Sequence, residues 1–225
     1  MDVLEAIFTR RSVRKFSDTA VEMEKIGIIL DAGRYAPSAG NLQAWKFILV
    51  TDAEKRKQIA EASLQQSWMA VAPVHIVVCS EPEKAEQFYG IRGERLYSVQ
   101  GCAACVQNML LACHAEGLAS CWVGAFEEEA LKRILGLPDS IRPQAVLPIG
   151  YSAEHPRHAT RQPLYDKVSV ESYGSHVKDI QHVFGYHSAR LQRYLQSTKA
   201  FATGEDKRLS RAWEKSKSLF SRRKN

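Results

Sequence analysis

Residues 73–80 read Pro-Val-His-Ile-Val-Val-Cys-Ser, a continuous run that is rich in β-branched and apolar side chains. Because apolar residues do not alternate with polar ones along it, the run is typical of a strand that is buried on both faces. A strand of this kind needs layers of structure on both sides of its sheet. The stretch therefore predicts a buried strand at the centre of a layered fold.

The segments on either side of this strand predict an alternation of strands and helices. Three more runs are predicted to be strands, at 45–51, 120–126 and 144–151. Helical spacing of apolar residues, together with capping signals, predicts helices at 3–8, 22–34, 52–66, 95–116 and 127–135. The alternation indicates a fold that mixes α and β structure.

The helix predicted over 95–116 is unusually apolar. Between 102 and 113 only Gln107 and Asn108 are polar, a pattern typical of a helix buried in a core or in a subunit interface. Cys102 and Cys105 form a Cys-x-x-Cys pair, which can indicate redox chemistry or half of a zinc site. Because the pair lies in the middle of an apolar helix and no second pair follows, we interpret both as inert buried thiols.

Composition narrows the class of protein. The 225 residues are 45% hydrophobic and 25% charged, which excludes a disordered chain, a coiled coil and a collagen-like fibre. No apolar run approaches the roughly 18 residues that a membrane-spanning helix needs, and the first residues do not resemble a secretory signal. The five cysteines are odd in number and lie in apolar stretches, so we expect a reducing, cytoplasmic location.

The net charge of +6 is concentrated near the C-terminus. Residues 176–225 contain 12 Lys and Arg against 4 Asp and Glu, whereas residues 1–175 contain 19 against 21. We therefore expect a nearly neutral domain over 1–175 and a basic helical C-terminal extension over 176–225. The extension is predicted to pack on the body or on a partner subunit. The alternative is an anionic partner, such as nucleic acid or a membrane surface.

Two segments carry residues that suit a bound ligand. Residues 10–15 read Arg-Arg-Ser-Val-Arg-Lys, and arginine forks with a hydroxyl suit phosphate oxygens, although a solvated basic turn has the same composition. Residues 37–45 read Pro-Ser-Ala-Gly-Asn-Leu-Gln-Ala-Trp. The small residues allow close backbone approach, and the two amides suit the edges of a heterocycle, although an ordinary loop is the alternative.

Together these segments resemble the FMN-dependent nitroreductase family. Further segments match the family's pattern in the same order: Val-Gln-Asn-Met-Leu-Leu-Ala (106–112), Gly-Leu-Ala-Ser-Cys-Trp (117–122), Gly-Ala-Phe (124–126), Leu-Gly-Leu-Pro (135–138), Ile-Gly-Tyr (149–151) and Arg161-x-Pro163-Leu164. The resemblance covers residues 2–166. It implies an α+β domain with a mostly antiparallel sheet wrapped by helices, and a homodimer whose flavin sites are shared between subunits.

The resemblance also implies roles for the cations near the N-terminus. Arg10, Arg11 and Ser12 would meet the phosphate and ribityl chain of FMN, helped by Arg161. Arg14 would lie near N1 and O2 of the flavin ring, where a cation stabilises the negative charge of the reduced flavin. This chain has Ala159 where some relatives have a lysine, so the phosphate contacts at this end stay open, with Arg157 and His158 as the candidates to replace that lysine.

Other residues would line the flavin ring itself. Gly124 and Ala125 would offer backbone groups near N5, and Gln65 would place a side-chain amide near the pyrimidine edge. Five residues of the 37–45 loop would line the flavin, in this family usually that of the partner subunit: Pro37, Ser38, Ala39, Asn41 and Gln43. The flavin carries the chemistry, so we name no protein group as the catalytic residue, and no metal is expected.

The function implied is an oxidoreductase that passes hydride from NAD(P)H through flavin N5 to a small electron acceptor. The acceptor would be a nitroaromatic, a quinone or another flavin, in a ping-pong reaction. Two alternatives stay open. One is an enzyme of other specificity on the same scaffold, such as a dehalogenase, a flavin-degrading enzyme or one that uses a deazaflavin. The other is a flavin- or anion-binding module without turnover, whose working surface is the basic extension.

Overall fold

A computed structural model describes residues 1–157, 159–162 and 166–175 of the chain, and the predicted basic extension over 176–225 lies outside them. The chain divides into two units, residues 1–158 and 159–225. The first unit contains the sheet and the named helices. The domain boundary expected at 175 stays a prediction.

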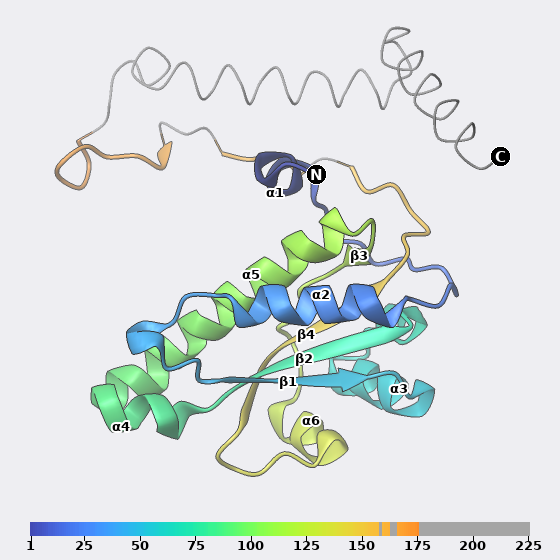
Figure 1. The fold of residues 1–225 in the computed structure, drawn as a ribbon, viewed down its shortest axis with the longest axis horizontal. Helices are drawn as coiled ribbons and strands as arrows, with labels where there is room; N and C mark the ends of the chain where they lie inside the picture. Colours follow the sequence, from blue (N-terminus) through green and yellow to red (C-terminus); the bar gives the residue numbers. More distant parts are fainter. Residues whose placement is uncertain (158, 163–165, 176–225) are drawn as a thin grey trace, which may run out of the picture. The chain divides into compact units, whose positions relative to one another are not determined.

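A four-stranded antiparallel sheet forms the centre of the first unit (Figure 1). Its strands are β1 (Trp45–Val50), β2 (Val74–Ser80), β3 (Ala119–Ser120) and β4 (Arg142–Gly150), in the order β1-β2-β4-β3. All three pairings are antiparallel. The α+β class with an antiparallel sheet and surrounding helices is confirmed.

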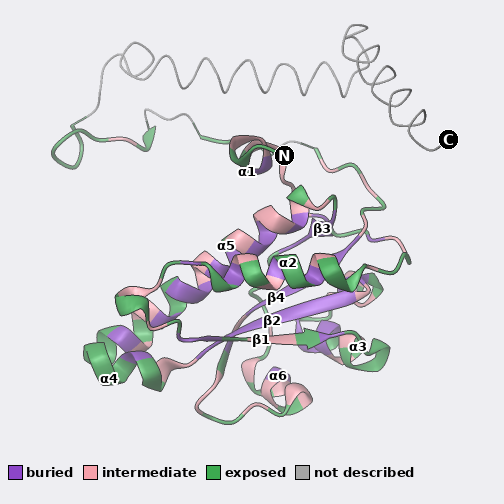
Figure 2. Cartoon of the chain, in the orientation of Figure 1, coloured by how far each residue is buried: buried purple, intermediate pink, exposed green. Residues whose placement is uncertain are grey.

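Strand β2 is buried along its whole length, as its sequence predicts (Figure 2). Side chains alternate between the two faces of a strand, so β2 contributes to two cores. Ile76 and Val78 belong to the cluster that includes buried residues of α2 (Met23–Arg34) and α5 (Ser98–Ala115). Val77 and Cys79 belong to the cluster that includes buried residues of α3 (Ala53–Ala62) and α6 (Glu128–Leu135). The two clusters are the apolar layers on either side of the sheet.

Two further helices complete the described fold, α1 (Val3–Thr9) and α4 (Pro82–Arg92). Asp2 caps α1 by accepting from the amide of Leu4, and Asp52 caps α3 by accepting from the amide of Lys55. The predicted cap at Asp52 is thus present, because a carboxylate there satisfies an amide that has no partner within the helix.

The structure corrects the extent of one predicted strand and one predicted helix, and it adds a helix. The strand predicted over 120–126 contains only the two residues of β3, and Val123 then makes a single bridge to Val146. The chain must leave the sheet there to reach α6, which begins at Glu128. Helix α4 was not predicted, and a π-helical turn over 93–97 separates it from α5, so the helix predicted from 95 begins at Ser98.

Helix α5 is amphipathic rather than buried all round. One face is buried, whereas Val99 is 37% exposed and Gln107 is exposed on the other. By length and composition, the helical stretch Pro82–Ala115 is apolar enough to cross a membrane. Core helices pass the same test, and Cys105, Val106 and other residues of α5 pack in the core cluster described above. The apolar composition of α5 is therefore explained by the packing of its buried face in the core.

The buried thiols on α5 are unreactive. Cys102 Sγ donates to the carbonyl of Cys79 at 3.6 Å, and all five cysteines are free. Burial raises the pKa of the Cys105 thiol to about 12. Since the thiolate is the reactive form, these side chains stay protonated and inert at neutral pH.

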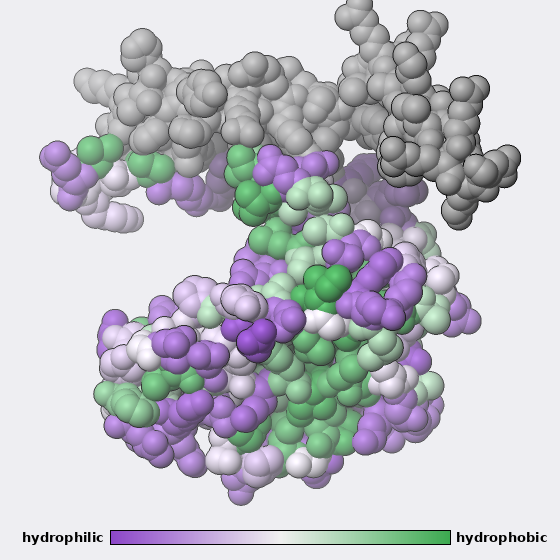
Figure 3. All heavy atoms as spheres, viewed as in Figure 1, coloured by the Kyte–Doolittle hydropathy of each residue, from purple (hydrophilic) through white to green (hydrophobic). Residues whose placement is uncertain are grey.

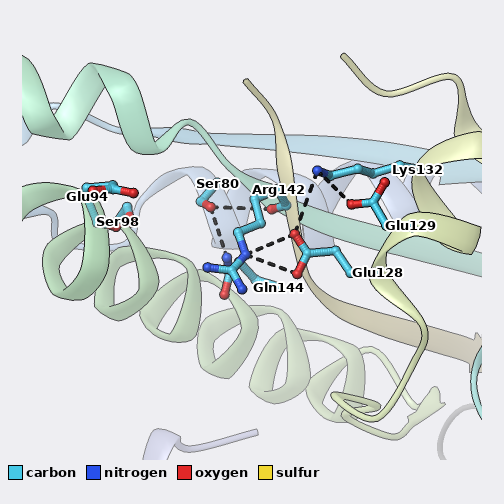
Figure 4. A network of polar contacts seen from close by, with 8 residues as sticks. All are labelled: Ser80, Glu94, Ser98, Glu128, Glu129, Lys132, Arg142 and Gln144. Carbon is cyan, nitrogen blue, oxygen red and sulfur yellow. Dashed lines mark hydrogen bonds and ion pairs between the residues drawn. The ribbon is translucent and has the colours of Figure 1, made fainter. Parts of the chain in front are cut away.

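A polar network at the surface attaches α6 to the sheet (Figure 4). Arg142 of β4 donates through Nε to both carboxylate oxygens of Glu128, at 2.9 and 3.1 Å. Lys132 pairs with Glu128 and Glu129 within α6. Strand β1 is at one edge of the sheet, and its residue Leu49 is partly exposed. Figure 3 shows apolar side chains gathered on the face of the molecule between α2 and α6.

His75 gives the fold a predictable acid sensitivity. It is fully buried in β2, its Nε2 lies 2.9 Å from the carbonyl of Met69, and burial lowers its pKa from 6.5 to about 4. The folded state therefore binds this proton less tightly than the unfolded chain. We expect this group to cost about 2 kcal/mol of stability between pH 7 and pH 5, with the loss complete only below pH 4.

Urea unfolding at pH 7 and pH 5 measures this effect. The variant His75→Gln should lose less stability between the two pH values than the unsubstituted protein, whereas the exposed control His155→Gln should behave like it. An equal loss in all three proteins would contradict the assignment to His75.

Candidate functional site

The N-terminal cations lie on an extended segment at the edge of the sheet. The amide of Val13 donates to the carbonyl of Ser120 at 3.1 Å, and Ser12 forms a parallel bridge with Ser120. Val13 is buried and anchors the segment. Because side chains alternate along an extended chain, Arg10, Ser12 and Arg14 share one side of the segment.

These three side chains lie near enough to one buried group, the thiol of Cys121, to influence its pKa. Burial raises the pKa of Cys121, and three neighbours oppose that rise: the charge of Arg14, a hydrogen bond with Ser12 and the charge of Arg10. Cys121 directly follows β3. The structure thus brings three predicted site residues to one place, beside the end of a strand.

Arg11 makes a different set of contacts. Its Nη1 donates to the carbonyl of Phe8 at 2.8 Å and to that of Arg10 at 2.7 Å. These carbonyls lie at the C-terminal end of α1, where the last carbonyls of a helix have no partners within it. Arg11 therefore provides hydrogen bonds to the C-terminal end of α1.

A pocket of about 330 Å³ opens beside this segment. It is lined by Met1, Thr9, Arg10, Arg11, Val13, His114, Gly117, Leu118, Ala119, Ser120, Ser152, Glu154 and Pro156. Thr9 Oγ1 donates to the carbonyl of Glu5 and lies 2.7 Å from His114 Nε2, which joins α1 to the end of α5. Burial and the nearby Arg10 and Arg11 lower the pKa of His114. The pocket therefore combines two guanidinium groups with a histidine that tends to stay neutral.

The backbone of Arg14 is held from the loop after β4. One carboxylate oxygen of Glu154 accepts from the amides of Arg14, at 2.6 Å, and Lys15, at 3.1 Å. The guanidinium of Arg14 lies over the ring of Trp68, 6.0 Å from its centroid. Sequence reasoning did not identify Trp68 or Glu154, since both contacts join segments far apart in the chain.

The Gly124–Ala125 segment lies beside Gln66, the neighbour of the predicted Gln65 in the sequence. Gln66 Nε2 donates to the carbonyl of Ser63 at 2.9 Å and approaches that of Ala125 at 3.5 Å. Gln65 is exposed, and its amide approaches the carbonyl of Glu61 at 3.5 Å. The place of Gln65 near the pyrimidine edge of a flavin stays a prediction.

The second predicted group lies in the loop before β1. Ser38 Oγ accepts from the amide of Gln43 at 3.0 Å, and Gln43 Nε2 donates to Asn41 Oδ1 at 3.2 Å. Pro37 and Asn41 are exposed, and Ala39 begins a 3₁₀ turn over 39–41. The loop therefore presents its two amides at the surface.

The two groups lie at opposite ends of α5. A Cβ built on Gly101 would lie 3.9 Å from the Cβ of Ser38, whereas Arg10 neighbours His114. Because an α-helix rises 1.5 Å per residue, Gly101 and His114 are about 20 Å apart along α5. One copy of the first unit therefore does not bring the Ser38 loop and Arg10 together.

Arg161 belongs to the second unit. It is exposed, and its Nη1 approaches the carbonyls of Ala159 and Thr160 at 3.4 and 3.3 Å. Its contact with a phosphate stays a prediction.

Comparison with known proteins identifies the family. A sequence profile of the Nitroreductase family matches residues 7–151. A predicted NADH dehydrogenase/NAD(P)H nitroreductase of Methanothermobacter thermautotrophicus is 40% identical over 162 residues, which cover 69% of this chain and 80% of that protein. The FMN reductase (NADPH) of Bacillus subtilis is 23% identical, and the match covers 87% of this chain and 84% of that protein.

A solved structure agrees with these sequence matches. An FMN-dependent nitroreductase of Clostridium difficile has a TM-score of 0.66 and 26% identity, covering 76% of this chain and 99% of that one. The fold, the site segment and the profile therefore define an oxidoreductase fold of the flavin-reductase type. The chain belongs to the nitroreductase family.

The loop before β1 requires a glycine at position 40. Gly40 has a φ of 54°, and a Cβ there would lie 2.5 Å from Tyr89 Oη. We expect Gly40→Ala to destabilise the protein by about 1–2 kcal/mol in urea unfolding. Adding Tyr89→Phe should recover part of the loss because it removes the clashing hydroxyl.

Gly27→Ala is the matched control, because nothing lies within 4 Å of its Cβ position and it sits inside α2. It should raise stability by about 0.5–1 kcal/mol. A Gly40→Ala variant as stable as the parent protein would contradict the steric argument.

Proposed function

We propose that this chain is an FMN-dependent oxidoreductase that takes hydride from NAD(P)H and reduces a small electrophile, such as a nitroaromatic, a quinone or a second flavin. The observation that carries the proposal is the extended segment beside Ser120, which places Arg10, Ser12 and Arg14 on one side. Bound FMN supplies the chemistry, since its ring accepts hydride and releases electrons to an acceptor. The FMN reductase and nitroreductase names among the relatives support this cofactor and reductant.

The donor set fits the two charged parts of FMN. Arg10 offers a planar guanidinium to phosphate oxygens, and Ser12 offers a neutral donor beside it. The adjacent pocket, with Arg11 and His114 in its lining, is large enough to admit the phosphate end. Arg14 would bind the pyrimidine edge of the ring, where its charge favours the anionic reduced form.

The remaining contacts belong to the ring edge and to the partner subunit. Gly124 and Ala125 would present backbone groups near N5, with Gln66 holding the carbonyl of Ala125 from behind. The Ser38 loop would line the ring of the other subunit's flavin, because within one chain it lies beside Gly101, whereas Arg10 lies beside His114 toward the other end of α5. A homodimer with two shared sites brings both groups together. The half-exposed face of α5 that includes Val99 is available for such contact.

Reductant and acceptor would use one face of the flavin in turn. The site residues named above bind and orient the cofactor, so selectivity for the acceptor would depend on the shape of the space over the ring. We also propose a cytoplasmic location, because all five thiols are free. The alternative in which the basic extension is the working surface concerns residues 176–225, which lie outside the described residues.

Arg14 provides the first test of the cofactor site. The purified protein should show flavin absorbance that bleaches on anaerobic addition of NADH or NADPH. Arg14→Ala should bind oxidised FMN about tenfold more weakly and reduced FMN more weakly still, because a charge-assisted contact is lost. Lys57→Ala removes a positive charge from exposed α3 and should change neither affinity. A colourless protein that does not bind FMN would overturn the proposal.

Subunit complementation tests the shared site. Arg14→Ala and Asn41→Ala damage different halves of each site. Random subunit exchange between the two variants should therefore restore one intact site in each mixed dimer, or about a quarter of all sites. FMN binding in the mixture, measured by fluorescence, should rise accordingly. A mixture that binds no more FMN than the average of its two components would show that each site lies within one chain.

A further inference from the structure

The side chain of Arg14 contacts an aromatic ring, that of Trp68, which has no role in the flavin site proposed above. Glu154 holds the backbone amide of Arg14, but it leaves the long side chain to be directed by something else. The guanidinium lies over the ring of Trp68 at 6.0 Å from the centroid, within the range of a cation–π contact. Arg14 itself is exposed, so in water its side chain has many accessible rotamers.

Trp68 is well placed to restrict those rotamers, because it is packed on two sides. Its ring stacks on that of Phe16, with centroids 6.3 Å apart, and Phe16 is only 5% exposed. Trp68 also packs against two apolar clusters, one that contains Val13 and Phe16 and one that contains Val77. Phe16 and Val13 belong to the same N-terminal segment as Arg14. The indole therefore joins that segment to the core of the sheet.

The backbone that carries Trp68 is fixed at both ends. Trp68 lies in the 3₁₀ turn Ser67–Val71. Just before the turn, Gln66 bonds to the carbonyl of Ser63 and approaches that of Ala125. Toward its end, Arg56 donates to the carbonyls of Ala70 and Ala72, at 2.7 and 2.6 Å. The same short segment therefore contacts both Arg14 and the 124–125 segment.

We propose that Trp68 is a positioning residue, which holds the guanidinium of Arg14 toward the pyrimidine edge of the flavin and so favours the reduced cofactor. The inference rests on the proposed function, in which Arg14 contacts that edge. An arginine held over an indole by a cation–π contact still has its N–H groups available to donate hydrogen bonds, because the aromatic face offers no lone pair to them. Trp68 acts through Arg14 and takes no part in the reaction itself.

A double-mutant cycle on the full chain isolates this role. The variants are Trp68→Leu, Trp68→Phe, Arg14→Ala and Trp68→Leu combined with Arg14→Ala. The measured quantity is the ratio of the dissociation constants for oxidised and reduced FMN, obtained from titrations and from the flavin reduction potential. Urea unfolding of each variant shows whether it is folded.

The proposal predicts a specific pattern. Trp68→Leu should lower the preference for reduced FMN about threefold, as expected for loss of a cation–π contact. Trp68→Phe, which keeps an aromatic face, should retain most of the preference even if Trp68→Leu folds poorly. In the Arg14→Ala background, Trp68→Leu should change the ratio no further.

Other patterns separate the two hypotheses. An equal change from Trp68→Leu with and without Arg14 would show that the indole does not act through Arg14, and would overturn the inference while leaving the proposed function intact. The same holds if Arg14→Ala lowers the ratio but Trp68→Leu and Trp68→Phe leave it unchanged. A ratio that does not respond to Arg14→Ala would instead remove the role of Arg14 on which both rest.

Discussion

The burial of β2 on both faces is the constraint on which the rest of the structure depends. Because Ile76 and Val77 point to opposite sides of the sheet, each side must be covered by its own layer of helices. The long helix α5 lies in one layer, and α3 and α6 belong to the other. The N-terminal segment of the proposed site lies at the edge of the sheet, where Ser12 forms a bridge with Ser120 of β3.

The sequence predicts the framework well because its signals are local. The continuous apolar run of β2 and the acidic cap at Asp52 each depend on a few neighbouring residues. The contact of Arg14 with Trp68 and that of Gln66 with Ala125 depend on segments that meet only in the folded chain. Helix α4 was missed for another reason, because apolar residues such as Phe88 are exposed on it and leave no amphipathic pattern.

The geometry of α5 links the fold to the proposed homodimer. The helix is long enough to keep the Ser38 loop away from Arg10, so the element that completes the core also separates the two parts of the proposed flavin site. Its apolar composition serves two surfaces, one packed against the sheet and one half-exposed at Val99. Periodicity alone does not distinguish a buried core face from a face reserved for a second subunit.

Two contacts of the N-terminal segment have a consequence for biosynthesis. These are the bridge between Ser12 and Ser120 and the hydrogen bond from the amide of Arg14 to Glu154. The N-terminal segment leaves the ribosome first, yet its partners are encoded more than a hundred residues later. At the usual elongation rates of 5–20 residues per second, Arg14 waits on the order of ten seconds for Glu154 to be made. The proposed cofactor site is therefore completed late in synthesis, and a nascent chain stopped before β4 lacks the carboxylate that holds the backbone of Arg14.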